Sequence, residues 1–283
     1  MRPVVRPSPA GSPRGFTLVE LSVVVALVVT LAAIYLAGAA VVQNRVRADR
    51  TRTTIRKIHE LIMPQYEGYQ RRRLPVGASA ATRLVAIRTL MLYEMPDNWG
   101  DVFASPAAVV SSGTSWLRTA PVLAYAATVA GLGGSGTVAT ANSSAECLYM
   151  VAARAGLEFD ALDRFREGEV GDTDGDGAPE FLDGWGNPII FIRWAPGYAS
   201  PVQRTDATNY HDPFDPMRVD ASGYALVPLI ASAGPDASPG LILSSSWNTS
   251  NLGSIVANSG TIGNADGTGA DVDNITNHDL VKK

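Results

Sequence analysis

The chain has 283 residues, enough for one large domain or two small ones, and its 46% hydrophobic and 18% charged residues exclude an intrinsically disordered tail protein. A single cysteine, Cys147, excludes an intramolecular disulfide framework and a cysteine-based zinc site, and we expect it to be a buried, inert thiol. The net charge of −4 is unevenly distributed: residues 1–75 carry 12 basic and 4 acidic side chains, whereas residues 76–283 carry 11 basic and 23 acidic ones. The acidic character of residues 76–283 argues against direct nucleic-acid binding.

Residues 21–42 form an apolar run without a charge or a proline. A helix of that length spans about 33 Å, which is enough to cross the hydrocarbon core of a bilayer. A buried helix of a soluble protein and a secretory signal peptide are the alternatives. The run is long for the apolar region of a signal peptide, and residues 39–43 make a poor cleavage site. We therefore predict a transmembrane helix.

The segment before this run reads Arg-Gly-Phe-Thr-Leu-Val-Glu-Leu over residues 14–21. It resembles the signature of type IV prepilins and of type II secretion pseudopilins, in which a short basic leader ends in glycine and a phenylalanine follows. The resemblance implies that a prepilin peptidase cuts between Gly15 and Phe16 and methylates the new terminal amine. Residues 1–15 would then be a cleaved leader, and Glu20 the fifth residue of the mature chain.

Glu20 is the one acidic residue at the edge of the apolar run. A charged carboxylate costs on the order of 2.5–3.5 kcal/mol at the centre of a bilayer, so it needs a partner. The resemblance implies one, because in pilin filaments this glutamate pairs with the terminal amine of a neighbouring subunit during assembly. The alternative is an acid that snorkels to the membrane interface.

Charge on either side of the run gives a conflicting indication of orientation. Six basic residues follow the run closely, and the leader has three: Arg45, Arg47, Arg50, Arg52, Arg56 and Lys57 after it, and Arg2, Arg6 and Arg14 before it. Excess positive charge marks the cytoplasmic side, which would place the amino terminus outside. The prepilin resemblance requires the opposite orientation, which we predict: a single pass through the cytoplasmic (inner) membrane, with the amino terminus in the cytoplasm and the head in the periplasm or on an extracellular filament.

Helices are predicted on both sides of a loop-rich insertion. The first helix should continue as an amphipathic extension over residues 43–75 until Pro64 bends or ends it. Apolar spacing predicts a helix over 83–93 that closes at Pro96, and Ser143 with Glu146 has the spacing of a capping box for a helix that Gly156 stops. The Ala-, Ser- and Gly-rich stretch 104–141 between them is expected to be a flexible surface insertion.

Strand patterns dominate the last third of the chain. Short β-branched or aromatic runs over 188–194, 224–230 and 240–243 lie between Gly, Pro and Asp turns. These patterns predict an α+β fold in which a long amino-terminal helix, half transmembrane and half amphipathic, packs on a small antiparallel sheet. We expect a helix at 16–42, its extension at 43–75, a helical and loop-rich insertion at 76–182, and the sheet with a carboxy-terminal loop at 183–283.

Residues 172–183 have the spacing of a calcium-binding loop. Oxygen donors fall at loop positions 1, 3, 5, 9 and 12, with a backbone carbonyl at position 7: Asp172, Asp174, Asp176, Glu180, Asp183 and the carbonyl of Ala178. Position 12 is an aspartate instead of the longer glutamate, and Pro179 removes an N–H that paired EF-hands use. We therefore expect a solitary structural calcium loop, with an Asp/Gly turn that binds no metal as the alternative.

Three later segments resemble the major pseudopilin of type II secretion: the Asp-Gly-Trp-Gly-Asn-Pro turn at 183–188, the strand and turn at 229–236, and the acidic segment at 271–277. In that family a loop before the carboxy terminus binds a structural calcium ion. The resemblance implies Asp271 and Asp273 as ligands of a second site, with Asp266 as a weaker candidate. Residues 65–170 have no counterpart in that family.

Together these patterns predict a structural subunit and not an enzyme. We expect prepilin peptidase, other pilin or pseudopilin subunits, the inner-membrane assembly platform and the membrane to be its partners, in a type IV pilus or a secretion pseudopilus. The alternative is a membrane-anchored calcium-binding adhesin or hydrolase that does not assemble into a filament. The hydrolase finds little support, because His59, His211 and His278 show no metal-ligand spacing.

Overall fold

We describe the chain from a computed structural model over residues 15–75, 79–103, 115–134, 138, 141–154, 161–243 and 251–280. It mixes helices with two small antiparallel sheets, in agreement with the predicted α+β class. The chain separates into two compact units, Met1–Arg45 and Val46–Lys283, which we treat in turn and refer to as the amino-terminal unit and the head. Helix α1, Leu18–Gly68, begins in the first unit and ends in the second.

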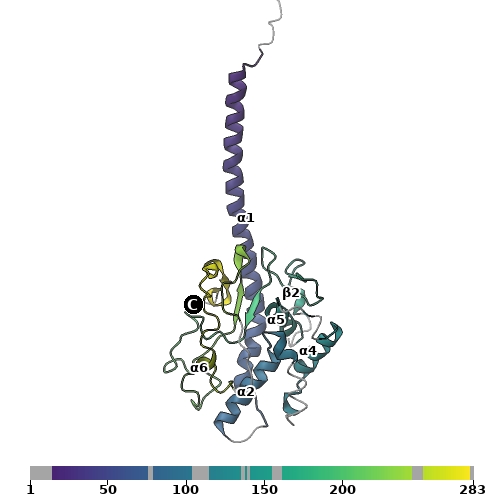
Figure 1. Ribbon diagram of the computed structural model, residues 1–283, viewed down its shortest axis with the longest axis vertical. Coiled ribbons are helices and arrows are strands. Elements are labelled where there is room, and N and C mark those ends of the chain that lie inside the picture. The colour runs from purple at the N-terminus through teal and green to yellow at the C-terminus, as the bar shows by residue number, and fades with distance from the viewer. Residues whose placement is uncertain are drawn as a thin grey trace, which may run out of the picture. The chain divides into compact units, whose positions relative to one another are not determined.

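From residue 18 to residue 45, the amino-terminal unit is one continuous stretch of helix α1 (Figure 1). Its large apolar side chains from Leu18 to Val42 are between 51% and 83% exposed, on every side of the helix. Its most apolar window has a mean hydropathy of 2.5, and within the described part of the chain it is the one helix long and apolar enough to cross a membrane. The membrane-spanning length predicted from the sequence is therefore present as a helix.

Within the head, α1 changes from an exposed to a packed helix. Ile55, Ile58 and Ile62 recur every three or four residues and are fully buried, which is the spacing of one helix face. Tyr66 continues this face, and its hydroxyl donates a 3.0 Å hydrogen bond to the carbonyl of Leu226. Of the two alternatives for Pro64, that it bends or that it ends the helix, the second is wrong, because α1 runs through Pro64 to Gly68 before the short 3-10 turn Tyr69–Arg71.

Among the described residues, the longer helices of the head besides α1 are α2 (Ala80–Glu94), α4 (Ala120–Gly131) and α5 (Ser143–Arg154). Helix α2 confirms the predicted helix and begins three residues earlier, since the hydroxyl of Ser79 accepts the N–H of Thr82 as an N-cap. Helix α4 corrects the expectation of a wholly flexible insertion. Its sequence shows little sign of a helix, because residues 120–131 are almost wholly apolar and offer no polar face to contrast with the buried Val122, Tyr125 and Val129.

Helix α5 begins at the predicted residue, but the predicted capping box does not form. The hydroxyl of Ser143 instead accepts the backbone N–H of Trp99 at 2.7 Å, and the carboxylate of Glu146 accepts the indole N–H of the same tryptophan. The carbonyl of Asn142 caps the first N–H groups of the helix. Gly156, the predicted stop, lies outside the described residues.

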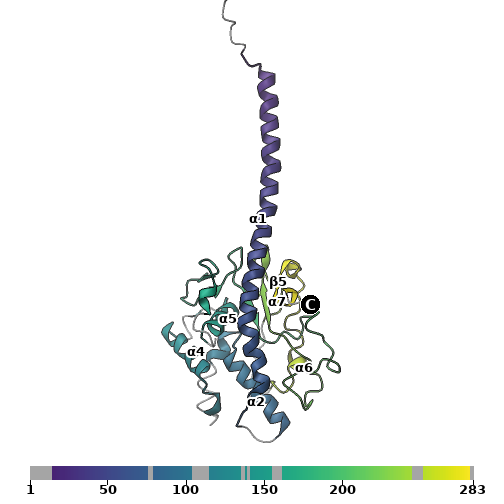
Figure 2. The same ribbon diagram turned by 180° about the vertical axis from the view of Figure 1, so that it is seen from behind.

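The strands are short. Strands β1 (Val170–Gly171) and β2 (Glu180–Phe181) form an antiparallel hairpin, and β3 (Ile190–Ile192), β4 (Leu229–Ser232) and β5 (Ile275–Thr276) form an antiparallel sheet with β4 in the centre. Helix α5 packs against β2 and β3. In both views α4, α5 and β2 lie on one side of the lower part of α1, whereas α6 (Ile255–Ser259), β5 and α7 (Asn277–Leu280) lie on the other (Figures 1 and 2).

Two of the three predicted strands need correction. The strand at 188–194 is confirmed at its centre by β3. The segment 224–230 joins a sheet only from Leu229, because Pro228 has no N–H to donate and the N–H of Val227 bonds to the side chain of Gln203. The segment 240–243 forms only an isolated bridge, from Leu241 to Ala265. The short 3-10 turns Ser115–Leu117, Leu162–Arg164, Gly234–Asp236 and Ala270–Asp273 complete the head.

The core of the head gathers side chains from α1, α2, α4, α5 and the three-stranded sheet. Cys147 lies within it and is fully buried. Burial raises the pKa of its thiol well above the ordinary value. A buried thiol that stays protonated is a poor nucleophile, in agreement with the expectation of an inert cysteine.

Candidate metal site and the amino-terminal segment

The acidic segment forms the loop of the β1–β2 hairpin. Gly171 pairs with Glu180, so residues 172–179 span the turn. The two carboxylate oxygens of Asp172 accept the N–H groups of Gly175 and Gly177 at 2.7 and 2.9 Å, and Asp176 accepts the N–H of Ala178. Both glycines have positive φ angles, of 78° and 91°, that other residues rarely adopt. The alternating Asp and Gly residues therefore fold a tight loop that turns carboxylates toward its centre.

One group of carboxylates in this loop consists of Asp172, Asp174 and Glu180, whose nearest oxygens lie within 4.8 Å of one another. Glu180 is fully buried and accepts the backbone N–H and the hydroxyl of Thr173. The side-chain amide of Asn142, just before α5, donates to the same carboxylate at 2.9 Å. Each oxygen of Asp172 and of Glu180 therefore already accepts at least one hydrogen bond from the protein.

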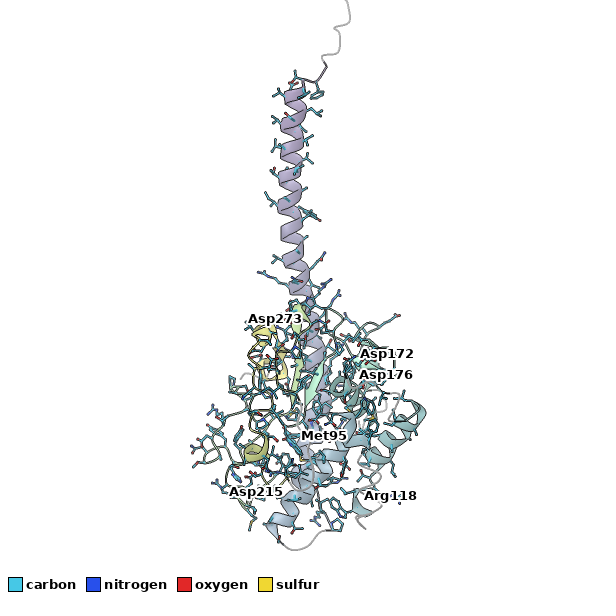
Figure 3. All side chains as sticks on the ribbon, in the orientation of Figure 1. Met95, Arg118, Asp172, Asp176, Asp215 and Asp273 are labelled. Carbon is cyan, nitrogen blue, oxygen red and sulfur yellow. The ribbon has the colours of Figure 1, made fainter. Side chains whose placement is uncertain are left out.

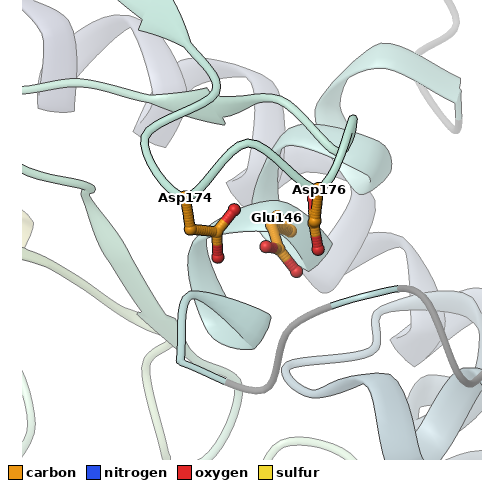
Figure 4. Close-up of side chains that lie close together, drawn as sticks. All are labelled: Glu146, Asp174 and Asp176. Carbon is orange, nitrogen blue, oxygen red and sulfur yellow. The ribbon is translucent and has the colours of Figure 1, made fainter.

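A second group consists of Glu146, Asp174 and Asp176, with oxygens that also approach within 4.8 Å (Figure 4). Asp174 and Asp176 project from the hairpin loop, and Glu146 projects from α5 into the space between them. Glu146 is 1% exposed, and its second oxygen, Oε1, has no hydrogen-bond partner among the described residues. The two groups share Asp174.

Crowding of these acids disfavours their charged forms. Burial, reinforced by the neighbouring carboxylates of Asp176, Asp174 and Glu180, raises the pKa of Glu146 to about 8, although the indole N–H of Trp99 partly opposes the shift. Burial and the carboxylates of Asp176 and Asp172 also raise the pKa of Asp174, and burial raises that of Glu180. Clusters of this kind can hold a metal ion, whose positive charge removes the mutual repulsion.

The structure brings together four of the six predicted loop ligands. Asp183 is in neither carboxylate group of the described chain: it accepts the N–H groups of Trp185 and Asn187 and the hydroxyl of Ser232 at 2.6 Å, and so holds the turn after β2. Ala178 is buried, and its N–H bonds to Asp176. Spacing within the loop could not reveal Glu146, because it lies on a helix 26 residues before Asp172.

The second predicted site is on the other side of the head. Asp271 and Asp273 lie in the 3-10 turn Ala270–Asp273, and Asp273 lies across α1 from Asp172 and Asp176 in Figure 3. Burial and the nearby carboxylate of Asp236 raise the pKa of Asp273. Asp266 accepts the N–H and hydroxyl of Thr268 instead. No group of three acidic ligands forms here among the described residues.

The residues of the prepilin-like motif lie directly before α1. Gly15 and Phe16 precede the helix, and Phe16 is 85% exposed. The hydroxyl of Thr17 accepts the N–H of Glu20, and the carboxylate of Glu20 accepts the backbone N–H of Thr17 at 2.8 Å. This reciprocal pair is a capping box, which the sequence analysis missed here. Glu20 therefore lies in the first helical turn, next to the predicted cleavage point.

Comparison of the chain with family models, with curated proteins and with solved structures finds no match. The function must therefore be argued from the residues and their geometry alone.

Proposed function

We propose that this chain is a pilin-like structural subunit, held in the cytoplasmic membrane, processed by prepilin peptidase and assembled into a type IV pilus or a type II secretion pseudopilus. One observation carries the proposal. Helix α1 begins two residues after Phe16, its part before Arg45 is apolar and exposed on every side, and Glu20 in its first turn forms a capping box with Thr17. Such a helix needs a lipid or protein environment, because so large an apolar surface is unfavourable in water.

Processing and assembly would use this segment in two stages. Cleavage after Gly15 frees an amine on Phe16, four residues before Glu20, and methylation modifies that amine. In the membrane the helix is surrounded by lipid; in the filament it packs against the same helix of other subunits. The carboxylate of Glu20 then has a cationic partner in the terminal amine of a neighbouring subunit, which offsets the cost of burying its charge. The assembly platform of the inner membrane would deliver each subunit.

The head has a separate role in this proposal. Its hairpin loop binds calcium, because hard cations of this size take six to eight oxygen ligands and the loop presents carboxylates without sulfur or nitrogen donors. The bound ion would rigidify the head, which is displayed in the periplasm or on the filament surface. Asp271 and Asp273 remain proposed ligands of a second calcium ion. We propose no catalytic role for the head.

The proposal is tested by replacing Glu20 with alanine in cells that assemble the filament. We expect Glu20→Ala to enter the membrane with a folded head but to be lost from sheared filaments, as measured by immunoblotting of membrane and filament fractions. Glu60→Ala is the matched control, since Glu60 is an exposed acid on the same helix beyond the apolar run. Normal assembly of the Glu20→Ala chain would contradict the pairing of Glu20 with a neighbouring subunit. Absence of the parent chain itself from sheared filaments would favour the alternative of a membrane-anchored calcium-binding protein outside any filament.

A further inference from the structure

Glu146 is a buried acid, and one of its two carboxylate oxygens has no hydrogen-bond partner among the described residues. Its side chain is 1% exposed, and the indole of Trp99 donates to one oxygen. No described residue donates a hydrogen bond to the other oxygen, and no described basic side chain forms an ion pair with Glu146. A buried carboxylate in this state is costly, so its position calls for a ligand that carries positive charge.

The carboxylates next to Glu146 indicate which kind of cation would bind there. Asp174 and Asp176 each place an oxygen within 4.8 Å of the oxygen of Glu146 and of each other (Figure 4). Calcium binds oxygen at about 2.3–2.6 Å, so two oxygens of one coordination shell lie at most about 5 Å apart. The three carboxylates therefore fit around a single calcium ion and supply only hard oxygen ligands.

We propose that Glu146 is a calcium ligand from outside the loop, and that it holds one ion together with Asp174 and Asp176. The ion would then join α5 to the β1–β2 hairpin, instead of lying within the contiguous loop 172–183. This inference rests on the calcium binding proposed above, and it replaces Asp183 with Glu146 as the acidic ligand that closes the site.

Hydrogen bonding distinguishes Glu146 from the acids of the loop, since Asp174 and Asp176 also accept hydrogen bonds, from Asn142 and from the N–H of Ala178. The oxygens of Asp172 and Glu180 accept N–H and O–H groups of the loop and of Asn142. These two acids shape the hairpin and prepare it for the ion. Glu146 has an oxygen with no such contact among the described residues, and it therefore gains most from a cation.

Space for the remaining ligands lies beside Glu146. A cavity of about 860 Å³ between α4 and α5 is lined by Glu146, Trp99 and the loop residues from Gly177 to Pro179. It is large enough to admit the several water molecules that complete a calcium shell with three carboxylates. The ion would reach the site through this cavity, and its binding would change the fluorescence of Trp99.

The test is calorimetric titration of calcium chloride into the full chain in detergent, after removal of metal with a chelator. We expect Glu146→Gln and Asp176→Asn each to weaken calcium binding by at least about tenfold, since each removes a charged ligand. Glu167→Gln is the matched control, because Glu167 is an exposed acid near the same hairpin and in neither carboxylate group. We expect it to bind calcium like the parent chain.

Two further measurements keep the outcome decisive. Glu146→Gln keeps an acceptor for the Trp99 indole, so its circular dichroism without metal should match the parent chain. Calcium should change the tryptophan fluorescence of the parent chain, and Trp99→Phe should abolish that change. If Glu146→Gln binds calcium as tightly as the parent while Asp172→Asn does not, the ion lies in the loop and the inference is overturned. If the parent chain binds no calcium, the calcium binding proposed for the hairpin loop is contradicted as well. Neither of these two results would contradict the proposed filament assembly.

Discussion

At the scale of single residues, His278 on α7 shows how the head responds to pH. It is 1% exposed, and its Nδ1 lies 2.8 Å from the hydroxyl of Ser200. Burial lowers its pKa from 6.5 to about 4, and the nearby His59 adds to this, while the carbonyls of Pro228 and Val227 and the charge of Asp279 oppose the shift. The folded chain therefore holds this imidazole neutral at a pH where the unfolded chain protonates it.

The sign of the effect follows from the protons bound in each state. Because the pKa of His278 is lower in the folded state, protonation of this residue does not reduce the free energy of unfolding above pH 6.5. As the pH falls from 6.5 toward 4, the unfolded chain binds the proton first, and the free energy of unfolding falls by about 3 kcal/mol in total. We expect His278→Gln to flatten the fall in the free energy of unfolding between pH 6.5 and 4, as measured by urea titration in detergent. Identical pH profiles for the two chains would contradict this prediction.

At the scale of elements, α2 is fixed to the carboxy-terminal loops by one buried arginine. Arg88 donates to the carboxylates of Asp212 and Asp220 at 2.7 and 3.1 Å and to the carbonyls of Leu252 and Gly253. Arg88 is 2% exposed, and both acids are buried. The arginine therefore neutralises two carboxylates that come from distant parts of the sequence.

Removing this charge should loosen α2 and the loops together. We expect Arg88→Met to lower the free energy of unfolding by about 3–5 kcal/mol, because it leaves two buried carboxylates without a cation. Arg83→Met is the control: Arg83 is exposed on the same helix, and its loss should change stability by no more than about 0.5 kcal/mol. Equal effects of the two substitutions in a urea titration would show that the buried network contributes little.

The elements that the sequence predicted well are those with local signals. The apolar faces of α1 and α2 repeat at helical spacing, and β3 is a β-branched and aromatic run between turns. Strands β1, β2 and β5 are two residues long, which is too short to show an alternating pattern. Pro64 does not end α1, because a proline near the end of a helix removes few backbone hydrogen bonds and α1 continues for only one further turn after it.

In the candidate site, too, the residues with a local sequence signal could be predicted and the residue brought in by packing could not. The spacing of Asp172, Asp174, Asp176 and Glu180 follows from calcium-loop chemistry, and the structure gathers these four acids in two overlapping groups. Asp183 satisfies the spacing as well, but Ser232 and the turn after β2 engage it. Glu146 could not be predicted, because only the packing of α5 on β2 brings it to the hairpin.

At the scale of the whole molecule, the two parts of the chain make different demands on their surroundings. The amino-terminal unit exposes apolar side chains from residue 18 to residue 42, and the head buries an apolar core and carries most of the acidic residues. The proposed subunit would meet both demands, since it would first be anchored in a membrane and then packed through the same helix in a filament. A soluble monomer would leave the apolar helix in water.

Mass spectrometry of the mature amino terminus from native membranes is the most direct test of the proposed prepilin processing. We expect a chain that begins at N-methylated Phe16, which would also place the amino terminus on the cytoplasmic side where the peptidase acts. A chain that retains Met1, or that begins near Val42, would contradict it.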